Sequence, residues 1–362
     1  MAYLILDRQK LRHNYDFLSR IFDNNRITWA VVSKLLCGNE TYLEEILALN
    51  PAQVCDARIS NLKVIRKLRP GIETIYIKPP PPRIAAAVVR YADISFNSQY
   101  RTLKLLSDEA VRQGKIHKAI ISVEMGERRE GVMHTQIVAL YEKACLLPGI
   151  RIIGLGANFA CLSGVLPSRE KYEKLAACSE LIAQKCGVRL PVLSGGSSVA
   201  IPLIFRGEIP KGINHFRIGE TLFFGTDVYD NCPLSGMYQD VFTLYAEIIE
   251  LSHKPLVPNG KIGRNLEGHT PEFLSGDRDK TIWRAIVDVG LLDVESNRLE
   301  PVDPDVECIG ASSDMLVINL ESNPRDYKTG DYLAFRTDYM GVLRLMNSRY
   351  IEKRVSGLLI GP

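Results

Sequence analysis

The chain has 362 residues, 46% hydrophobic and 24% charged, which is typical of a folded chain with one large domain and a smaller one. Its 45 basic and 42 acidic residues are mixed along the sequence and give a net charge of +3, so no basic stripe predicts nucleic-acid binding. No apolar stretch reaches the roughly 18 residues of a membrane span, and the start, MAYLILDRQK, does not read as a targeting segment. We expect a cytoplasmic protein with no nucleic-acid and no membrane partner.

The cysteines and histidines do not form a recognisable metal site. None of the eight cysteines has the spacing of a zinc knuckle, and the six histidines are scattered, so we predict no protein-built metal centre. A disulfide scaffold normally accompanies secretion, and we therefore expect free thiols. Cys145, Cys178 and Cys186 lie in helical patterns, and we interpret them as small buried hydrophobes.

Strand-like and helix-like segments alternate through the first two thirds of the chain. Residues 2–7, AYLILD, form a strand-like opening, and residues 8–22 follow as a predicted helix. Amphipathic helical patterns then separate eight short apolar or β-branched runs, at 28–33, 52–57, 74–78, 93–97, 118–125, 150–158, 191–198 and 215–225. Such alternation requires parallel pairing with right-handed crossovers. Eight units fit a closed (β/α)8 barrel, over residues 8–232, better than an open doubly wound sheet.

The pattern changes after residue 232. The remaining strand-like pieces are separated by turn-rich segments with little helical periodicity; they lie at 241–252, 281–290, 306–311, 315–321 and 331–337. We predict a C-terminal β domain over 233–356, to which residues 1–7 add a strand.

Lys34 interrupts the apolar run in WAVVSKLLCGN, residues 29–39. It stands at the end of the first barrel strand, and the carboxyl ends of the strands form the active-site face of such barrels. One interpretation is a lysine that caps the strand and extends to solvent. The other is a Schiff-base lysine, because a partly desolvated amine has a lowered pKa and becomes nucleophilic toward aldehydes.

The last two barrel strands favour the second interpretation. The seventh ends in LSGGSSVA and the eighth in FRIGETLFFG. Glycine backbone and serine hydroxyls at this place typically bind phosphate, and we predict a cradle built from Ser197 and the backbone of Gly195, Gly196, Gly219 and Glu220. Arg217 adds a permanent cation inside the ring. A lysine opposite a phosphate cradle suits a phosphorylated aldehyde, for which pyridoxal 5'-phosphate (PLP) is the candidate.

Several segments resemble the alanine racemase family of barrel-type PLP enzymes, and within it the ornithine racemase branch. AVVSKLLCGN is similar to the family's lysine-bearing first strand, VEMGERREG to its arginine-bearing segment, and FRIGE to its Arg-x-Gly loop. GASSDML and LMNSRY resemble its C-terminal signature segments. The resemblance covers nearly the whole chain.

The resemblance implies roles for three charged residues. Lys34 would hold PLP as an internal aldimine and, once displaced by substrate, act as one of two bases that exchange the α-proton. Arg129 would face the phenolic oxygen of PLP or the substrate carboxylate; the alternative is an ordinary ion pair with Glu127 or Glu130. Arg217 would donate to the pyridine nitrogen, or alternatively form a salt bridge to Glu220.

Other cofactor contacts are also implied by the resemblance. Asn158 would contact the PLP ring at the place where relatives carry a histidine. Ser197, Gly219 and Glu220 would bind the phosphate, together with a C-terminal tyrosine. Either Tyr350 or Tyr339 could supply that tyrosine.

The sequence departs from the family pattern at the second base. Relatives carry a tyrosine in a Gly-Tyr-x-Asp segment, whereas VDVGLLDVE places Leu291 there, and leucine cannot transfer a proton. Ser313, Asp314 and Cys37 are the candidates for this base, and a one-base mechanism with Lys34 is the alternative.

We therefore expect a PLP-dependent amino-acid racemase that acts as a homodimer, with each site completed by the partner's C-terminal domain. The substrate would be a free amino acid, either a basic one such as ornithine or lysine, or alanine, with Asp314 or Asp293 as partner of a side-chain amine. The alternatives are a decarboxylase on the same scaffold, against which Arg217 argues, and a non-catalytic PLP-binding protein.

Overall fold

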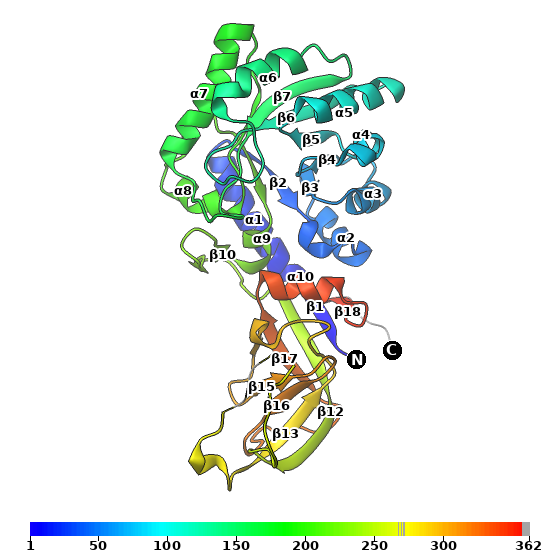
Figure 1. Ribbon diagram of the computed structural model, residues 1–362, viewed down its shortest axis with the longest axis vertical. Coiled ribbons are helices and arrows are strands. Elements are labelled where there is room, and N and C mark those ends of the chain that lie inside the picture. Colours follow the sequence, from blue (N-terminus) through cyan, green and yellow to red (C-terminus); the bar gives the residue numbers. More distant parts are fainter. Residues whose placement is uncertain (267, 269, 271, 357–362) are drawn as a thin grey trace. The chain divides into compact units, whose positions relative to one another are not determined.

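The computed structural model describes residues 1–356 except 267, 269 and 271. Residues 9–239 form one compact unit, and residues 1–8 form a second unit with the described residues from 240 onward. Figure 1 shows the helices and strands of both units. In the described part of the chain, no helix is long and apolar enough to cross a membrane.

The larger unit is a closed barrel of eight parallel strands. The strands pair in chain order, and the last pairs with the first; they are β2 (Thr28–Val32), β3 (Gln53–Asp56), β4 (Glu73–Tyr76), β5 (Ile94–Asn97), β6 (His117–Ser122), β7 (Ile150–Gly156), β8 (Val192–Ser194) and β9 (His215–Ile218). The barrel closes with Ala30 opposite Arg217. The predicted (β/α)8 fold is confirmed.

Helices surround the barrel strands (Figure 1). They are α1 (Arg8–Asn24), α2 (Glu40–Ala48), α3 (Ile59–Leu68), α4 (Ala85–Tyr91), α5 (Tyr100–Arg112), α6 (Ile137–Ala144), α7 (Arg169–Cys186), α8 (Ile201–Phe205) and α9 (Glu220–Phe224). Two begin at side-chain caps, because Asn39 accepts from the Tyr42 N–H at 3.0 Å and Ser168 from the Lys171 N–H at 3.4 Å.

The interior of the barrel is apolar at its middle. Side chains from five neighbouring strands form one buried cluster, made of Ala30, Val32, Cys55, Ile75, Ile94, Phe96 and Ile120. Ala30 and Val32 in β2, and Ile94 and Phe96 in β5, are two residues apart, and this spacing places both members of each pair on the same, inward face of their strand.

Two expectations about this unit are wrong. The strand predicted over 215–225 ends at Ile218, and Gly219 separates it from α9; the apolar run LFFG packs as a short buried helix, which periodicity cannot distinguish from a strand. Cys178 is buried and Cys186 half-buried as small hydrophobes, but Cys145 is exposed.

The smaller unit is an antiparallel sheet. Its strands run in the order β14 (Leu299–Pro301), β17 (Tyr332–Thr337), β12 (Phe242–Pro255), β13 (Thr281–Val287), β16 (Leu316–Asn319) and β15 (Glu307–Ala311). Strand β1 (Tyr3–Asp7) pairs with β12 and, in parallel, with β18 (Glu352–Ser356), so the N-terminal strand joins this sheet as predicted. Helix α10 (Tyr339–Asn347) was not expected from the sequence.

Strand β1 is fixed by burial of alternate side chains. Leu4 and Leu6 are fully buried, whereas Ile5 between them is only half-buried. Leu6 lies opposite Phe242 of β12 and Val355 of β18.

Truncating Leu6→Ala should lower the free energy of unfolding by about 2–5 kcal/mol, because it leaves a cavity between three strands. Ile5→Ala, on the opposite face of the same strand, should cost clearly less. Urea unfolding of both variants measures this, and equal losses would contradict the packing assigned to β1.

Candidate functional site

Lys34 begins a single 3-10 turn, Lys34–Leu36, directly after β2. Ser33 before it is buried and donates its hydroxyl to the Cys55 carbonyl at 3.1 Å and to the Asp56 carboxylate at 2.9 Å. Cys37 closes the turn with a φ of 50°. Lys34 is exposed in the described chain, and the partly desolvated amine expected there stays a prediction.

The carboxylate that anchors this turn is itself buried. Asp56 accepts from the Arg58 N–H at 2.8 Å and from the Asn61 amide at 3.1 and 3.2 Å, in addition to Ser33. Burial raises the pKa of Asp56, and these hydrogen bonds oppose the rise. The strand-end turn that carries Lys34 is therefore tied to a rigid polar cluster.

Arg217 is a buried cation inside the barrel. Its side chain donates to Ser194 Oγ and, at 3.0 Å, to the Ala157 carbonyl, and its guanidinium lies 4.4 Å from the centre of the Phe96 ring. These contacts of Arg217 do not include Glu220, the alternative partner predicted from the sequence. Burial lowers the pKa of Arg217. Its remaining N–H groups have no described partner.

The predicted phosphate cradle lies where β8 and β9 end. The N–H groups of Gly196 and Ser197 and the Ser197 hydroxyl have no hydrogen-bond partner among the described residues. Gly219 approaches β2 so closely that a Cβ there would lie 3.2 Å from Val32 Cβ. Three donors are thus left for a ligand between the two strand ends.

Two of the cradle's backbone groups are already committed. The Gly195 N–H donates to the His215 carbonyl at 2.8 Å, within the barrel, so Gly195 does not belong to the predicted cradle. The Gly219 N–H donates to Ser198 Oγ at 3.3 Å. Glu220 begins α9 directly after Gly219.

Arg129 lies on the loop after β6 and is exposed. Its guanidinium forms a two-pronged ion pair with Glu130, which is the ordinary alternative that we kept open. The pair orients the guanidinium, and a substrate carboxylate would have to compete with Glu130 for it.

Glu127, by contrast, anchors a neighbouring loop. Its buried carboxylate accepts from four backbone N–H groups of the loop after β7, at 2.8–3.3 Å; they belong to Cys161, Leu162, Ser163 and Val165. Burial raises the pKa of Glu127, the four hydrogen bonds lower it more, and the result is a lowered pKa. From sequence we considered Glu127 only as a partner of Arg129, because the residues it binds lie more than 30 positions away.

Asn158 lies at the start of the loop that Glu127 holds. It is half-buried, and its amide contacts the Cys161 sulfur at 3.0 Å. Lys34, Arg129, Asn158 and Ser197 follow the carboxyl ends of β2, β6, β7 and β8, and Arg217 lies within β9, one residue before its end.

The smaller unit brings together two segments far apart in the sequence. Leu291 N–H donates to the Ser312 carbonyl at 3.0 Å, and Leu292 N–H to the Ser313 carbonyl at 2.8 Å. A Cβ at Gly290 would lie 2.5 Å from the Asp314 backbone, so only glycine permits this approach. Ser313 and Asp314 are exposed and lie beside Leu291.

The remaining candidates of the smaller unit differ in their surroundings. Asp293 is buried and accepts from the Ser348 hydroxyl at 2.5 Å and from the Gly290 N–H at 3.3 Å, so its carboxylate is already occupied. Tyr350 is 74% exposed and Tyr339 half-buried. Asp314 is the more accessible acid for a substrate amine.

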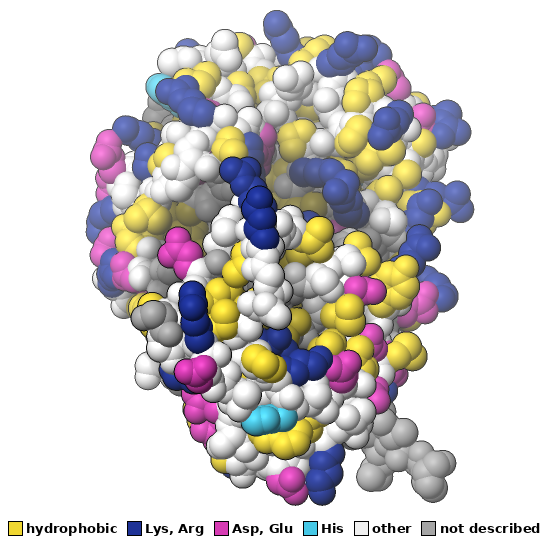
Figure 2. Space-filling view, turned by 60° about the horizontal axis from the view of Figure 1, so that its bottom comes forward, with side chains coloured by type: hydrophobic (Ala, Val, Ile, Leu, Met, Phe, Trp, Pro, Cys, Tyr) yellow, Lys and Arg dark blue, Asp and Glu magenta, His cyan; other side chains and the backbone are white. Residues whose placement is uncertain are grey.

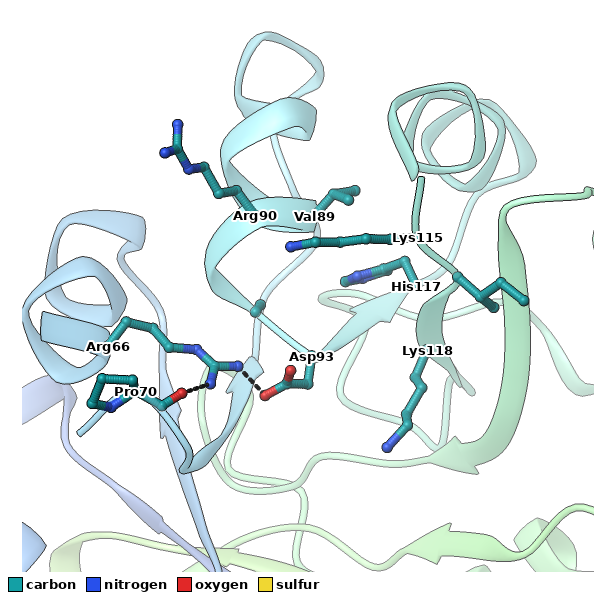
Figure 3. Close-up of a pocket in the computed structure, with 10 residues that line it drawn as sticks. Arg66, Pro70, Val89, Arg90, Asp93, Lys115, His117 and Lys118 are labelled. Atoms are coloured by element: carbon teal, nitrogen blue, oxygen red, sulfur yellow. Dashed lines mark hydrogen bonds and ion pairs between the residues drawn. The ribbon is translucent and has the colours of Figure 1, made fainter. Parts of the chain in front are cut away.

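The barrel unit also carries a cavity of about 500 Å³ at the opposite, amino-terminal ends of β5 and β6. Figure 3 shows its lining, in which Arg66 is held by Pro70 and Asp93. None of the predicted site residues lines it. Basic and acidic side chains are interspersed on the face shown in Figure 2.

Comparisons with known proteins show which family this chain resembles. The model of the family "Alanine racemase, N-terminal domain" matches residues 6–227. An ornithine racemase of Acetoanaerobium sticklandii is 34% identical over 97% of this chain and 99% of its own length. A lysine racemase of Thermotoga maritima is 32% identical, with 97% of each chain covered.

Solved structures match the fold at lower identity. An alanine racemase of Bartonella henselae with covalently bound pyridoxal phosphate has a TM-score of 0.73 and 14% identity, with 98% of this chain and 99% of that chain covered.

Replacing Glu127→Ala should free the loop that it holds, because four backbone donors lose one shared acceptor. Amide hydrogen exchange of Cys161, Leu162 and Val165 should accelerate by about tenfold or more, while Glu130→Ala, the matched control, should leave these amides unchanged. Folding lowers the pKa of Glu127 below its ordinary value of 4.5. The Glu127 carboxylate therefore stabilises the loop fully above pH 4.5, and this stabilisation is lost as the pH falls through the lowered pKa. Unchanged protection in Glu127→Ala would contradict the assigned role.

Proposed function

This chain belongs to the alanine racemase family, and we propose that it racemises a free basic amino acid, ornithine or lysine, with PLP as cofactor. The observation that carries the proposal is the pairing of β2, which presents Lys34, with β9, which holds the buried Arg217. The substrate class follows from relatives named ornithine and lysine racemase over almost the whole chain.

The donor set at the barrel mouth fits PLP. The unpartnered N–H groups of Gly196 and Ser197 and the Ser197 hydroxyl suit a phosphate, with Gly219 and Glu220 beside them, and the Lys34 amine suits the aldehyde. Arg217 would donate to the pyridine nitrogen, and Asn158 would contact the ring. When bound, the cofactor supplies an electron-withdrawing system that stabilises the negative charge left at the α-carbon.

Arg217 also favours racemisation over decarboxylation. A guanidinium does not give up its proton, so it leaves the pyridine nitrogen unprotonated and the ring a weaker electron sink. A weaker electron sink would favour return of the proton to the same carbon over loss of carbon dioxide. Arg129, released from Glu130, would bind the substrate carboxylate or the phenolic oxygen.

In a two-base mechanism, one group transfers the proton on each face of the α-carbon. Lys34 Nζ would remove and return the proton on one face. Ser313 or Asp314 would serve the other, supported by their exposure beside Leu291, with Cys37 and a one-base role of Lys34 as alternatives. Asp314 would also be suited to bind the substrate's side-chain amine.

We also propose a homodimer in which the C-terminal sheet of one subunit completes the site of the other. The support is that Ser313, Asp314 and Tyr350 are exposed on the smaller unit, where a partner can reach them. A tyrosine there, Tyr350 or Tyr339, would bind the cofactor phosphate.

The PLP-loaded enzyme in D₂O should exchange the α-proton of ornithine and lysine and convert each enantiomer to the other. Lys34→Arg keeps the charge but should lower exchange by about 10²–10⁴-fold, because a guanidinium neither binds the aldehyde nor accepts the proton. Lys78→Arg, at the end of a nearby strand, is the control and should remain active. Loss of the α-proton NMR signal measures this, and unimpaired exchange in Lys34→Arg would disprove the assignment.

Removing the second base should abolish conversion of one enantiomer to the other while α-proton exchange with solvent continues. In Asp314→Asn or Ser313→Ala we expect racemisation to fall by about 10²–10⁴-fold, while Lys34 still exchanges the α-proton of the one enantiomer that it faces. Chiral chromatography combined with deuterium incorporation distinguishes the two. Full racemisation in both variants, with loss in Cys37→Ala, would transfer the role to Cys37.

A further inference from the structure

A continuous line of hydrogen bonds crosses the barrel interior and ends at Arg217. It starts at the amino-terminal ends of the strands, where Lys118 Nζ donates to Glu73 Oε1 at 2.7 Å and Gln53 Nε2 donates to Glu73 Oε2 at 2.6 Å. Figure 3 shows the Lys118 side chain directed away from the other basic residues of its cavity. Gln53 is therefore linked to a carboxylate that an ammonium group holds in place.

The line continues through His215 and Ser194. His215 Nε2 lies 3.0 Å from Gln53 Oε1, His215 Nδ1 lies 2.9 Å from Ser194 Oγ, and Ser194 Oγ contacts Arg217 Nη1. His215 is 3% and Arg217 6% exposed.

Every donor and acceptor in this line has a forced direction. Glu73 only accepts, so the Gln53 amide turns its N–H₂ toward Glu73 and its oxygen toward His215. That oxygen only accepts, so the proton of the imidazole lies on Nε2 and Nδ1 is an acceptor. Ser194 then donates to Nδ1 and keeps a lone pair for Arg217.

The charge state of His215 agrees with these directions. Burial, and secondarily the nearby Arg217 cation, lowers the pKa of His215 to about 3, so the ring is neutral at physiological pH. A protonated ring would place a second cation beside Arg217 and would need Ser194 Oγ to accept from both sides.

We propose that Gln53 and His215 are positioning residues for Arg217, which act through Ser194 to hold the guanidinium in one orientation in the barrel. The proposal deepens the proposed function, since it concerns the group that would face the cofactor ring. Arg217 is hydrogen-bonded to Ser194, and His215 lies one contact and Gln53 two contacts further along the line. Each acts by fixing the direction of the next hydrogen bond.

Exchanging the two ends of the Gln53–Glu73 contact tests the proposal. Gln53→Glu alone places two carboxylates together and removes the donor, and it should lower kcat of the PLP-loaded enzyme by on the order of ten- to a hundredfold, with KM little changed. The double variant Q53E/E73Q restores every direction, because the carboxylate at position 53 accepts from His215 and from the amide at position 73. The kcat of this double variant should recover to within about threefold of the parent. Gln99→Glu, the same change at an exposed position, should have no effect.

The tautomer of His215 gives a readout that needs no cofactor and no activity. Long-range ¹H–¹⁵N spectra of histidine-labelled protein should show a neutral ring protonated at Nε2 in the parent and in the double variant, and an altered ring in Gln53→Glu. An Nδ1-protonated or cationic His215 in the parent, or a double variant as impaired as Gln53→Glu, would overturn the proposal. Absence of racemisation with the expected His215 tautomer would instead count against the proposed function alone.

Discussion

The buried guanidinium of Arg217 is the constraint around which the barrel interior is organised. Removing a cation from water is costly unless its donors are satisfied. Among the described residues the Glu130 carboxylate favours the charge of Arg217 electrostatically, but it is not one of the hydrogen-bond partners of the guanidinium. Instead one carbonyl, one hydroxyl and the face of Phe96 surround it. These contacts stabilise the charge of Arg217 only partly and leave some of its N–H groups available to a ligand. Incomplete satisfaction of a buried group is expected at a functional site.

The rest of the site follows from the strand ends around that cation. Pairing of β2 with β9 places Ala30 opposite Arg217, with Lys34 in the turn that follows the same strand. The turn between β8 and the following helix leaves the N–H donors of Gly196 and Ser197 unused among the described residues. The loops beyond are held by carboxylates, Asp56 under the Lys34 turn and Glu127 under the Asn158 loop. Rigid anchoring of this kind pre-organises a site before any ligand binds.

Periodicity made the barrel predictable, because eight apolar runs separated by amphipathic helices leave few other topologies. It did not separate a strand from a short buried helix at 220–224, nor find α10. Lys34 and Arg217 were recognisable because charged residues in apolar strands are conspicuous. The roles of Glu127 and His215, and the contact of Leu291 with Ser312, could not be predicted, since they depend on pairings between residues distant in sequence. The domain limits at 232 and 233 stay a prediction.

In the proposed function, Arg217 would donate to the cofactor ring and keep the pyridine nitrogen unprotonated. The ¹⁵N chemical shift of PLP labelled at the pyridine nitrogen, measured in the loaded enzyme, tests this most directly. We expect the shift of a neutral, hydrogen-bonded pyridine that stays constant between about pH 6 and pH 9, because arginine remains charged throughout this range. A pyridinium shift in the wild-type enzyme would contradict it.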